Sequence, residues 1–438
     1  MENLAEGIRQ KTATVAVIGL GYVGLPVACT LAHAGFRVLG IERDHTKAAN
    51  ISEGLCPIGG DEPGLVDLLA EVLDAGRLKV STDHQDCREA DVILIAVETP
   101  VDPHSKAPAY EALRAALSAL GPNLKPGDLV IVESTIAPGT MDEVVRPVLE
   151  ETSALKADGG FYLAFCPERV MPGKLLANLR NCDRVIGGAT PQAAELAREL
   201  YRHFVEGDLD LTDTLTAELV KATENTYRDV QIAFANEIAV LCENVGANVH
   251  EVRELVNKSP FRDMHVPGAG VGGHCIPKDP WLLLHGTQGK LQARLVPTAR
   301  SINDSMPLHV AQLAEDCLVA SGREMQGAQV TVLGYAYLEN TSDARNSPTI
   351  PLVQSLQESG ATITIHDPHF EEYDLDLEEA VSGSDCVILM VAHDEYRALD
   401  LADLRVWVST PVLVDGRNVW DKTRARDLGF VYAGVGNR

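Results

Sequence analysis

The chain has 438 residues, which is enough for about three domains of roughly 150 residues each. Apolar residues make up 45% and charged residues 23%, so collagen-like, disordered and small disulfide-stapled proteins are excluded. The 37 Lys and Arg residues against 63 Asp and Glu give a net charge of −26. A surface this acidic repels nucleic-acid backbones and anionic lipid, so we expect neither as a partner. A small phosphate-bearing ligand is still compatible, because backbone N–H groups and a few local cations can hold it.

Nine cysteines are scattered along the chain, and none of them forms a C-x-x-C pair. This odd, dispersed set is typical of free thiols in a reducing compartment. The N-terminus lacks a basic segment followed by an apolar one, and no apolar run reaches the length of a membrane span. The sequence therefore predicts a cytoplasmic protein.

The first hundred residues alternate strand-like with helix-like segments. Residues 14–19 form a β-branched run, residues 25–34 show helical apolar spacing and end at Gly35, and residues 36–42 predict a second strand. Further strands are predicted at residues 91–97, 129–133, 161–166 and 184–187. Apolar runs that do not alternate, separated by helical stretches, indicate a parallel sheet covered on both faces.

The middle of the chain, from about residue 212 to 256, follows another pattern. Glycine and proline nearly vanish over residues 214–245, where apolar residues fall at helical spacing. A helix this long is typical of a connector or a dimer spine. A Gly- and Pro-rich loop follows at residues 260–280, and then a second helical stretch at residues 299–321.

The alternation of strand-like and helix-like segments recurs near the C-terminus. Strands are predicted there at residues 328–334, 361–367, 385–392 and 411–415. This weak duplication predicts an α/β protein with two Rossmann-like, doubly wound parallel-sheet domains joined by the long central helix. The expected division is a cofactor-binding domain at 1–205, a central helical and dimerisation domain at 206–322, and a second nucleotide-type domain at 323–438.

Residues 19–24 (GLGYVG) fit the pattern G-x-G-x-x-G between a predicted strand and a predicted helix. In that pattern Gly19 makes the tight turn, Gly21 lets the backbone approach a pyrophosphate, and Gly24 allows close packing of helix and strand. Glu42 ends the second strand, 18 residues after Gly24, where an acid hydrogen-bonds the adenosine ribose. An acid at that position repels a 2′-phosphate, so the pattern predicts NAD rather than NADP.

Cys275 lies in a glycine-rich loop, residues 268–280 (GAGVGGHCIPKDP). Four glycines within six residues let the backbone press against a ligand, and Lys278 and Asp279 supply a cation and a carboxylate near the thiol. A reactive cysteine is one interpretation of this loop, and a tight structural turn with an incidental thiol is the other. The adjacent His274 and Cys275 lack the spacing of metal ligands, so no metal is expected.

Lys221 and Asn225 stand four residues apart on the long helix and therefore share one face. Small neighbours, Ala217 and Ala222, would leave room for a ligand. Taken alone, such a pair is more often part of a solvated helix surface, and that interpretation is favoured on these residues by themselves.

Together these motifs resemble the UDP-glucose/GDP-mannose dehydrogenase family over nearly the whole chain. The matching stretches are residues 19–26 (GLGYVGLP), 62–65 (EPGL), 99–100 (TP), 133–140 (ESTIAPGT), 167–169 (PER), Lys221 with Asn225, 268–280, 342–348 around Arg345, and 415–418. The versions PER and GVGGHCIP are most similar to the branch that oxidises UDP-N-acetylhexosamines, of the GlcNAc or ManNAc type.

The resemblance implies an NAD-dependent, four-electron oxidation of a sugar C6 alcohol to a carboxylate, through a thiohemiacetal and a thioester on Cys275. The implied catalytic residues are Cys275, Lys221, Asn225, Asp279, Glu168 and Thr135. The implied cofactor contacts are Gly19, Gly21, Tyr22, Val23, Gly24, Glu42, Arg43, Thr99, Thr135, Lys278 and Arg345. The implied substrate contacts are Glu168, Arg169, Lys221, Asn225, Arg262 (reaching across a dimer), Gly273, Tyr337 and Arg417.

Three alternatives stay open at this point. One is a non-enzymatic NAD-binding regulator, which would bind NAD and lose no activity when Cys275 and Lys221 are both substituted. UDP-glucose is the nearest one, because Lys278 is similar to the UDP-glucose branch. A two-electron dehydrogenase of the hydroxyacid type also pairs a Rossmann domain with a helical domain, but it leaves Cys275 and the C-terminal half without a role. The partners expected are a UDP-sugar and a second copy of the chain, as a homodimer or a higher homo-oligomer.

Overall fold

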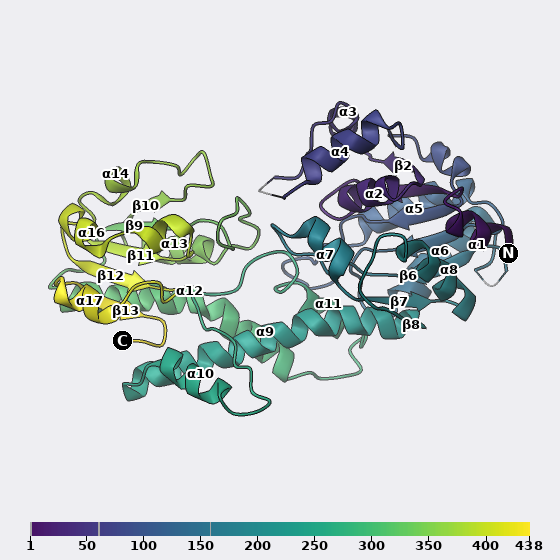
Figure 1. Ribbon diagram of the computed structural model, residues 1–438. Helices are drawn as coiled ribbons and strands as arrows, with labels where there is room; N and C mark the ends of the chain where they lie inside the picture. Colours follow the sequence, from purple (N-terminus) through teal and green to yellow (C-terminus); the bar gives the residue numbers. More distant parts are fainter. Residues whose placement is uncertain (1, 60–61, 158) are drawn as a thin grey trace. The chain divides into compact units, whose positions relative to one another are not determined.

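The computed structural model describes residues 2–59, 62–157 and 159–438 (Figure 1). The chain divides into two compact units. The first unit consists of residues 1–224 and 281–292, and the second consists of residues 225–280 and 293–438. Helix α9 (Thr214–Val245) carries the chain from the first unit into the second, over the range that the sequence predicts.

The first unit is built on an eight-stranded sheet with the order β3-β2-β1-β4-β5-β6-β7-β8. The strands are β1 (Thr14–Ile18), β2 (Arg37–Ile41), β3 (Leu78–Ser81), β4 (Val92–Ile95), β5 (Leu129–Val132), β6 (Tyr162–Phe165), β7 (Arg184–Gly188) and β8 (Leu209–Asp213). The first six follow the order 3-2-1-4-5-6 of a doubly wound dinucleotide-binding sheet, in which ligands bind at the carboxyl ends of the strands where the order reverses. Here that reversal falls between β1 and β4.

Helices cover both faces of this sheet (Figure 1). Val15 and Val17 of β1 pack toward one side, and Ala16 and Ile18 pack toward the other. The helical elements are α1 (Glu2–Arg9), α2 (Gly24–His33), α3 (His45–Ser52), α4 (Leu65–Asp74), the 3-10 turns η1 (His84–Glu89) and η2 (Gly121–Asn123), α5 (Glu111–Leu120), the π-helical turn η3 (Met141–Val145), α6 (Arg146–Ser153), α7 (Leu175–Asn181) and α8 (Pro191–Tyr201).

Helix α2 shows how the local sequence sets its boundaries. It begins at Gly24 and ends at His33, with Gly35 in the left-handed region at φ +110°. The N–H groups of Gly35 and Phe36 close the helix end on the carbonyls of Ala32 and Leu31, which is the Schellman arrangement. The predicted end of this helix at Gly35 is thereby confirmed.

One strand pair departs from the predicted parallel sheet. Strand β7 runs antiparallel to β6, through the pairs Ala164–Gly188 and Phe165–Gly187, while every other adjacent pair of described strands in this sheet is parallel. An apolar run indicates burial but not strand direction, and direction depends on where the connection returns. Strands β3 and β8 are not predicted from the sequence, because they are partly exposed and lack a long apolar run.

The second unit contains a five-stranded sheet, all parallel, with the order β10-β9-β11-β12-β13. The strands are β9 (Gln329–Leu333), β10 (Thr362–His366), β11 (Cys386–Leu389), β12 (Val412–Asp415) and β13 (Val431–Gly434). The helices are α10 (Val249–Asn257), α11 (Asp279–His285, which continues into the first unit), α12 (Leu295–Ala320), α13 (Thr349–Glu358), α14 (Leu377–Val381), α15 (Asp394–Ala398), α16 (Leu401–Trp407) and α17 (Lys422–Asp427). The order 2-1-3-4-5 is the shorter doubly wound arrangement, so the predicted second α/β domain is confirmed.

Two general features of the chain bear on its chemistry. All nine cysteines are free thiols, and six of them are buried. Among the helices that the structure describes, none is both long enough and apolar enough to cross a bilayer.

Candidate active site

The glycine-rich turn after β1 gives each of its three glycines a separate role. Gly19 lies in the left-handed region at φ +90°, and a Cβ there would stand 2.7 Å from the carbonyl oxygen of Ala96. A Cβ on Gly24 would come within 1.8 Å of the carbonyl oxygen of Gly19. A Cβ on Gly21 would meet nothing within 4 Å, so the space beside this residue is open. An open second glycine at the start of a helix is the cradle that a pyrophosphate requires.

Glu42, directly after β2, presents its carboxylate to this turn. Its Oε2 accepts the N–H of Leu20 at 3.2 Å, its Oε1 accepts the N–H of Asp44 at 3.2 Å, and Lys47 Nζ lies 2.9 Å from Oε2. Burial raises the pKa of Glu42, but the bonds from Lys47 and the two N–H groups outweigh it, so the pKa is lowered overall. Glu42 is therefore ionised at neutral pH and can accept a hydrogen bond from a ribose hydroxyl. Lys47 is a neighbour that the sequence analysis did not anticipate.

Three further predicted cofactor contacts stand near the same turn. Tyr22 donates a hydrogen bond of 2.5 Å to Glu62, which also accepts backbone N–H groups beyond β6. Val23 caps α2 with its backbone only. Arg43 is exposed and pairs with Glu98 at 3.0 Å. Tyr22 is therefore held in place, whereas Arg43 lies on the surface.

Thr99 and Thr135 follow strands β4 and β5 and lie side by side. The Thr99 hydroxyl donates to the carbonyl oxygen of Thr135 at 2.6 Å, and both residues are buried. Ser134 donates to the carbonyl oxygen of Val97 at 2.6 Å. These bonds tie together the segments after β4 and β5, and β4 is the strand that pairs with β1 before the glycine turn.

Lys221 is a buried residue of α9, only 5% exposed, so the solvated-surface interpretation of this lysine is wrong. Its Nζ donates to the carbonyl oxygen of Glu168 at 2.5 Å and lies 3.6 Å from Glu168 Oε1. Glu168 is also buried, and its Oε2 accepts the N–H of Val170 at 2.6 Å. An ammonium beside a carboxylate can stabilise an oxyanion and assist a water molecule.

Arg169, a predicted substrate contact, is already engaged within the first unit. It forms an ion pair with Glu224 of α9 and donates to the carbonyl oxygen of Asp183 at 2.6 Å. These bonds give Arg169 a structural role in holding the segment after β6 to α9.

In the second unit, Cys275 lies in the glycine-rich loop, four residues before α11 begins at Asp279. Its carbonyl accepts the N–H groups of Lys278 at 3.1 Å and Asp279 at 2.9 Å, so the loop closes into the first turn of the helix. The side chain of Cys275 is half-buried. The thiol therefore lies in the turn that leads into α11.

Asp279 is fully buried and receives two polar neighbours from the predicted set. Asn225 Nδ2 donates to Asp279 Oδ2 at 2.6 Å, and Lys278 Nζ lies 3.5 Å from Asp279 Oδ1. The three predicted residues Asn225, Lys278 and Asp279 thus form one cluster. A buried carboxylate held by an amide and a cation has a fixed orientation for work with a water or a hydroxyl.

The glycines of this loop serve packing as well as access, which changes the sequence-based interpretation. A Cβ on Gly272 would stand 2.5 Å from Tyr337 Cβ, and one on Gly273 would stand 2.7 Å from Tyr337 Cε2. A Cβ on Gly268 would come within 2.7 Å of Arg417 Nη1. The loop backbone therefore presses against the chain's own side chains, two of which are predicted substrate contacts.

Arg345 and Tyr337 lie within electrostatic reach of the Cys275 thiol. Burial raises the pKa of Tyr337 to about 12, with further upward contributions from Asp343 and from Cys275. The hydrogen bonds to Asp343 raise the pKa of Arg345, to which Cys275 also contributes. The carbonyl of Arg345 accepts the N–H of Gly273 at 2.8 Å, which joins this segment to the cysteine loop.

The two remaining predicted substrate contacts differ in burial. Burial lowers the pKa of Arg417 to about 10, and its Nε donates to the carbonyl oxygen of Met390 at 2.6 Å. Arg262 is exposed in the loop after α10, beside Phe261, which is fully exposed at φ +63°. A half-buried guanidinium can bind a phosphate, whereas the predicted reach of Arg262 across a dimer stays a prediction.

A buried polar chain that sequence reasoning missed supports the cysteine loop. Arg300 of α12 pairs with Asp229 of α9 at 2.5 Å, and Asn303 donates to the same carboxylate at 2.7 Å. Asn236 donates to Asn303 at 2.9 Å and accepts the N–H of Gly268 at 2.9 Å. The helical spacing of these residues could have revealed a shared face, but not their partners.

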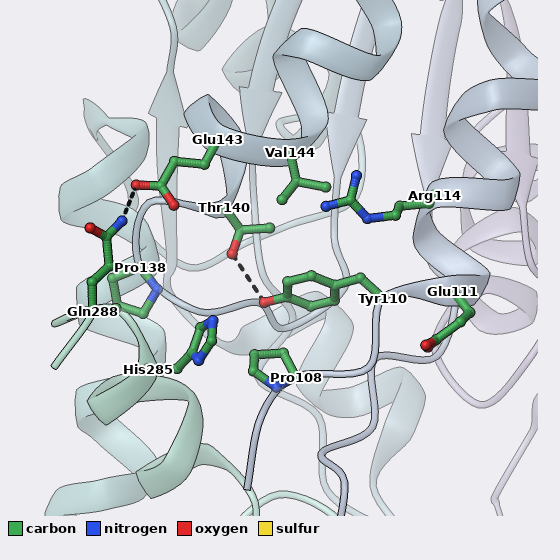
Figure 2. Close-up of a pocket in the computed structure, with 11 residues that line it drawn as sticks. Pro108, Tyr110, Glu111, Arg114, Pro138, Thr140, Glu143, Val144, His285 and Gln288 are labelled. Carbon is green, nitrogen blue, oxygen red and sulfur yellow. Dashed lines mark hydrogen bonds between the residues drawn. The ribbon is translucent and has the colours of Figure 1, made fainter. Parts of the chain in front are cut away.

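A cavity of about 430 Å³ lies in the first unit, beside the segment that follows Thr135 (Figure 2). Tyr110, Thr140 and His285 are among its lining residues, and no predicted site residue of the described chain lines it. Over the described residues, no group of three or more His, Cys, Asp or Glu side chains could hold a metal ion.

The predicted site residues therefore fall into two sets, one in each unit. The first unit holds Gly19, Gly21, Tyr22, Val23, Gly24, Glu42, Arg43, Thr99, Thr135, Glu168, Arg169 and Lys221. The second unit holds Asn225, Arg262, Gly273, Cys275, Lys278, Asp279, Tyr337, Arg345 and Arg417.

Comparison with known proteins places three segments of the chain in one family. Residues 13–205 match the UDP-glucose/GDP-mannose dehydrogenase family, NAD binding domain, residues 215–305 match its central domain, and residues 331–422 match its UDP binding domain. The chain is 38% identical over 422 residues to UDP-N-acetyl-D-mannosamine dehydrogenase of Pyrococcus horikoshii, covering 96% of this chain and 99% of the relative.

Two other comparisons agree with this match. NDP-N-acetyl-D-galactosaminuronic acid dehydrogenase of Ralstonia nicotianae is 36% identical over 427 residues, covering 94% of this chain and 97% of the relative. The solved structure of the UDP-D-ManNAc dehydrogenase from Pyrococcus horikoshii superimposes with a TM-score of 0.92 at 38% identity, over 97% of this chain and 99% of the other.

Proposed function

The chain belongs to the UDP-glucose/GDP-mannose dehydrogenase family, whose members are NAD-dependent, and we propose that it oxidises the C6 hydroxyl of a UDP-N-acetylhexosamine to the carboxylate. In this reaction one R–CH2OH, two NAD+ and one water yield R–COO−, two NADH and three H+. The observation that carries the proposal is the grouping of Cys275 with the buried cluster of Asp279, Asn225 and Lys278. A two-electron oxidation of an alcohol has no use for a nucleophilic thiol, whereas a thiol that captures the aldehyde retains it for oxidation to the acid.

Each catalytic role is supported by contacts within one unit. Asp279, oriented by Asn225, takes the proton of the C6 hydroxyl through a water. Lys221 stabilises the oxygen anion that forms at C6. When NAD+ is bound, it supplies the acceptor for a hydride at each of the two oxidations.

Cys275 retains the intermediate between the two oxidations. Its thiolate forms an S–C bond with the aldehyde carbon, which gives a thiohemiacetal, and oxidation of that carbon leaves a thioester. Water then attacks the carbonyl carbon, the C–S bond breaks, and the electron pair returns to sulfur as the carboxylate leaves. Glu168 assists this hydrolysis, with Thr135 holding the water.

For the substrate, we propose UDP-ManNAc or UDP-GlcNAc, with UDP-ManNAc first because the relative and the solved structure from Pyrococcus horikoshii are named as dehydrogenases of that sugar nucleotide. The half-buried Arg417 would bind the diphosphate, and Tyr337 and Gly273 would contact the nucleotide sugar from the same unit. The UDP binding domain at residues 331–422 contains Tyr337 and Arg417.

We also propose a homodimer formed along α9. Three large apolar side chains stand exposed at seven-residue intervals on this helix: Tyr227 at 63%, Phe234 at 56% and Leu241 at 52%. A repeat of seven residues keeps apolar side chains on one helix face, which a second helix can cover. All three of these side chains belong to the second unit.

Product stoichiometry tests the proposed reaction. The purified protein is incubated with NAD+ and UDP-ManNAc, UDP-GlcNAc, UDP-glucose or UDP-galactose, and NADH and uronate are both quantified. We expect two NADH per uronate with an N-acetylated sugar, and no acid from Cys275→Ala. The matched control is Cys182→Ala, which removes another free, half-buried thiol and should leave turnover unchanged. One NADH per turnover with release of an aldehyde would refute the four-electron reaction, and a preference for UDP-glucose would refute the substrate.

A further inference from the structure

A buried acid on α9, Glu218, holds a loop of the proposed cofactor site. Glu218 is 1% exposed, and both of its carboxylate oxygens accept backbone N–H groups. Oε2 accepts from Gly139 at 2.7 Å, and Oε1 accepts from Met141 at 2.8 Å. Neither the glycine turn nor the cysteine chemistry described above uses this residue.

The segment that Glu218 contacts, residues 134–141, connects β5 to the π-helical turn η3. Gly139 adopts the left-handed region at φ +92°, and η3 begins at Met141. The N–H groups at the start of a helical turn have no partner within the turn, and a carboxylate is the acceptor that stabilises them best. Glu218 therefore fixes the far end of the segment that begins with Ser134 and Thr135.

The same segment is held at its near end and its middle by other side chains. Thr99 bonds the carbonyl of Thr135, and the Tyr110 hydroxyl accepts the N–H of Ala137 at 2.8 Å. Figure 2 shows the Tyr110 hydroxyl beside Thr140, with 3.0 Å between the two oxygens. Backbone bonds within the segment are few, so its shape depends on these side chains.

Glu218 also stands on the helix face that carries Lys221, one turn away. Helix α9 therefore carries both the acid that holds the segment of Thr135 and the buried lysine Lys221. Resting on the proposed function, we propose that Glu218 is a positioning residue, which fixes Thr135 relative to Lys221 and so sets the shape of the nicotinamide side of the cofactor site.

The charges around Glu218 make its two hydrogen bonds to the backbone of the segment sensitive to pH. Burial raises the pKa of Glu218 to about 7; the two N–H bonds lower it, and Asp142 and Glu143 of η3 raise it. Tyr110, whose own pKa is raised mainly by burial and partly by Glu218, faces it from the segment before α5. Below neutral pH the carboxyl carries a proton on one oxygen, so one of the two N–H groups loses its acceptor.

The test compares Glu218→Gln with Glu237→Gln, which removes an exposed acid of the same helix. The glutamine side chain turns an NH2 group toward one N–H donor, so one hydrogen bond is lost while size is preserved. We expect Glu218→Gln to raise the Kd for NAD+, measured by calorimetry without sugar, and the KM for NAD+ by about tenfold each. The KM for the sugar should change much less. Glu237→Gln should match the wild type.

The pH profile supplies a second readout. The NAD+ affinity of the wild type should fall between pH 8 and pH 6, and that of Glu218→Gln should stay flat over the same range. Glu218→Asp, which keeps the charge on a shorter side chain, should give intermediate values, and it replaces the glutamine variant if that variant does not fold. Unfolding of both variants would assign Glu218 to stability alone and overturn the proposal.

The outcomes separate this inference from the proposed reaction. If the wild type binds NAD+ but oxidises no UDP-sugar, the proposed reaction fails while the NAD+ affinity still reports on Glu218. If the wild type is active and Glu218→Gln keeps the wild-type NAD+ Kd, KM and pH profile, the positioning role is refuted.

Discussion

The buried ion pair between Arg184 and Glu133 allows the sharpest stability prediction. Arg184 of β7 is 2% exposed and Glu133 is fully buried, with 3.5 Å between Nη1 and Oε1. Tyr201 donates to Glu133 at 2.6 Å, and Arg184 stacks over the Tyr201 ring at 4.9 Å. Glu133 stands two residues before Thr135, a predicted cofactor contact, at the carboxyl end of β5.

The magnitude follows from the separation and the burial. At 3.5 Å and an effective dielectric constant of about 20, the attraction is roughly 5 kcal/mol. Arg184→Met removes the cation and leaves a buried carboxylate, so we expect a loss of about 3 to 5 kcal/mol in the free energy of unfolding. In a unit of this size, that corresponds to a fall in Tm of about 10 °C. The double variant Glu133→Gln with Arg184→Met should recover most of the loss, because no charge then remains buried.

The pH dependence of the same variant has a definite sign. Burial raises the pKa of Glu133 and Arg184 lowers it, so removal of the arginine raises it further. An acid with a folded pKa above its unfolded value of about 4.3 loses stability as pH rises from that value through the folded pKa. Arg184→Met should therefore be closer to the wild type at pH 5 than at pH 8. Thermal unfolding followed by circular dichroism measures both effects. Equal losses in the single and double variants, at both pH values, would refute the coupling.

Three further predictions concern the cofactor and the assembly. Gly21→Ala should fold normally, because its Cβ meets nothing within 4 Å, but it should weaken NAD+ binding at least about tenfold. Gly24→Ala should also lower the Tm, because its Cβ would lie 1.8 Å from a backbone oxygen. Equal Tm values for the two variants would contradict this reasoning. Glu42→Ser removes an ionised acid and leaves the Lys47 cation able to pair with a 2′-phosphate. The kcat/KM for NADP+ divided by that for NAD+ should therefore rise about tenfold. An unchanged ratio would show that Glu42 does not select the cofactor. Phe234→Glu should convert a dimer to a monomer in sedimentation, and a wild type that is monomeric at micromolar concentration would refute the dimer.

Much of the fold could be predicted because its strands are long apolar runs. The strands beginning near Thr14, Val92 and Leu129 are buried on both faces, so their sequences need no alternation. Three strands were missed, β3, β8 and β13, of which β3 and β8 are partly exposed at the sheet edges. The antiparallel return of β7 was missed because no local pattern encodes the direction of a strand.

The candidate site divides in the same way. The glycine turn, Glu42 and the cysteine loop carry signals within a few residues, so their presence could be read directly. Lys221 could not be distinguished from a surface lysine, because its burial depends on Glu168, 53 positions away in the chain. Glu218 carried no signal at all, since its partners Gly139 and Met141 lie about eighty positions earlier.

The class of this protein can be predicted from local sequence features: a dinucleotide-binding turn, a thiol in a glycine-rich loop, and two α/β halves joined by a helix of 32 residues. These features are local, because backbone conformation, glycine freedom and apolar spacing act over a few residues at a time. The tertiary structure alone decided which charges are buried and with what they pair, as for Lys221 with Glu168 and Asp279 with Asn225. Burial and pairing set the pKa and orientation of a group, and both depend on residues that only folding brings together.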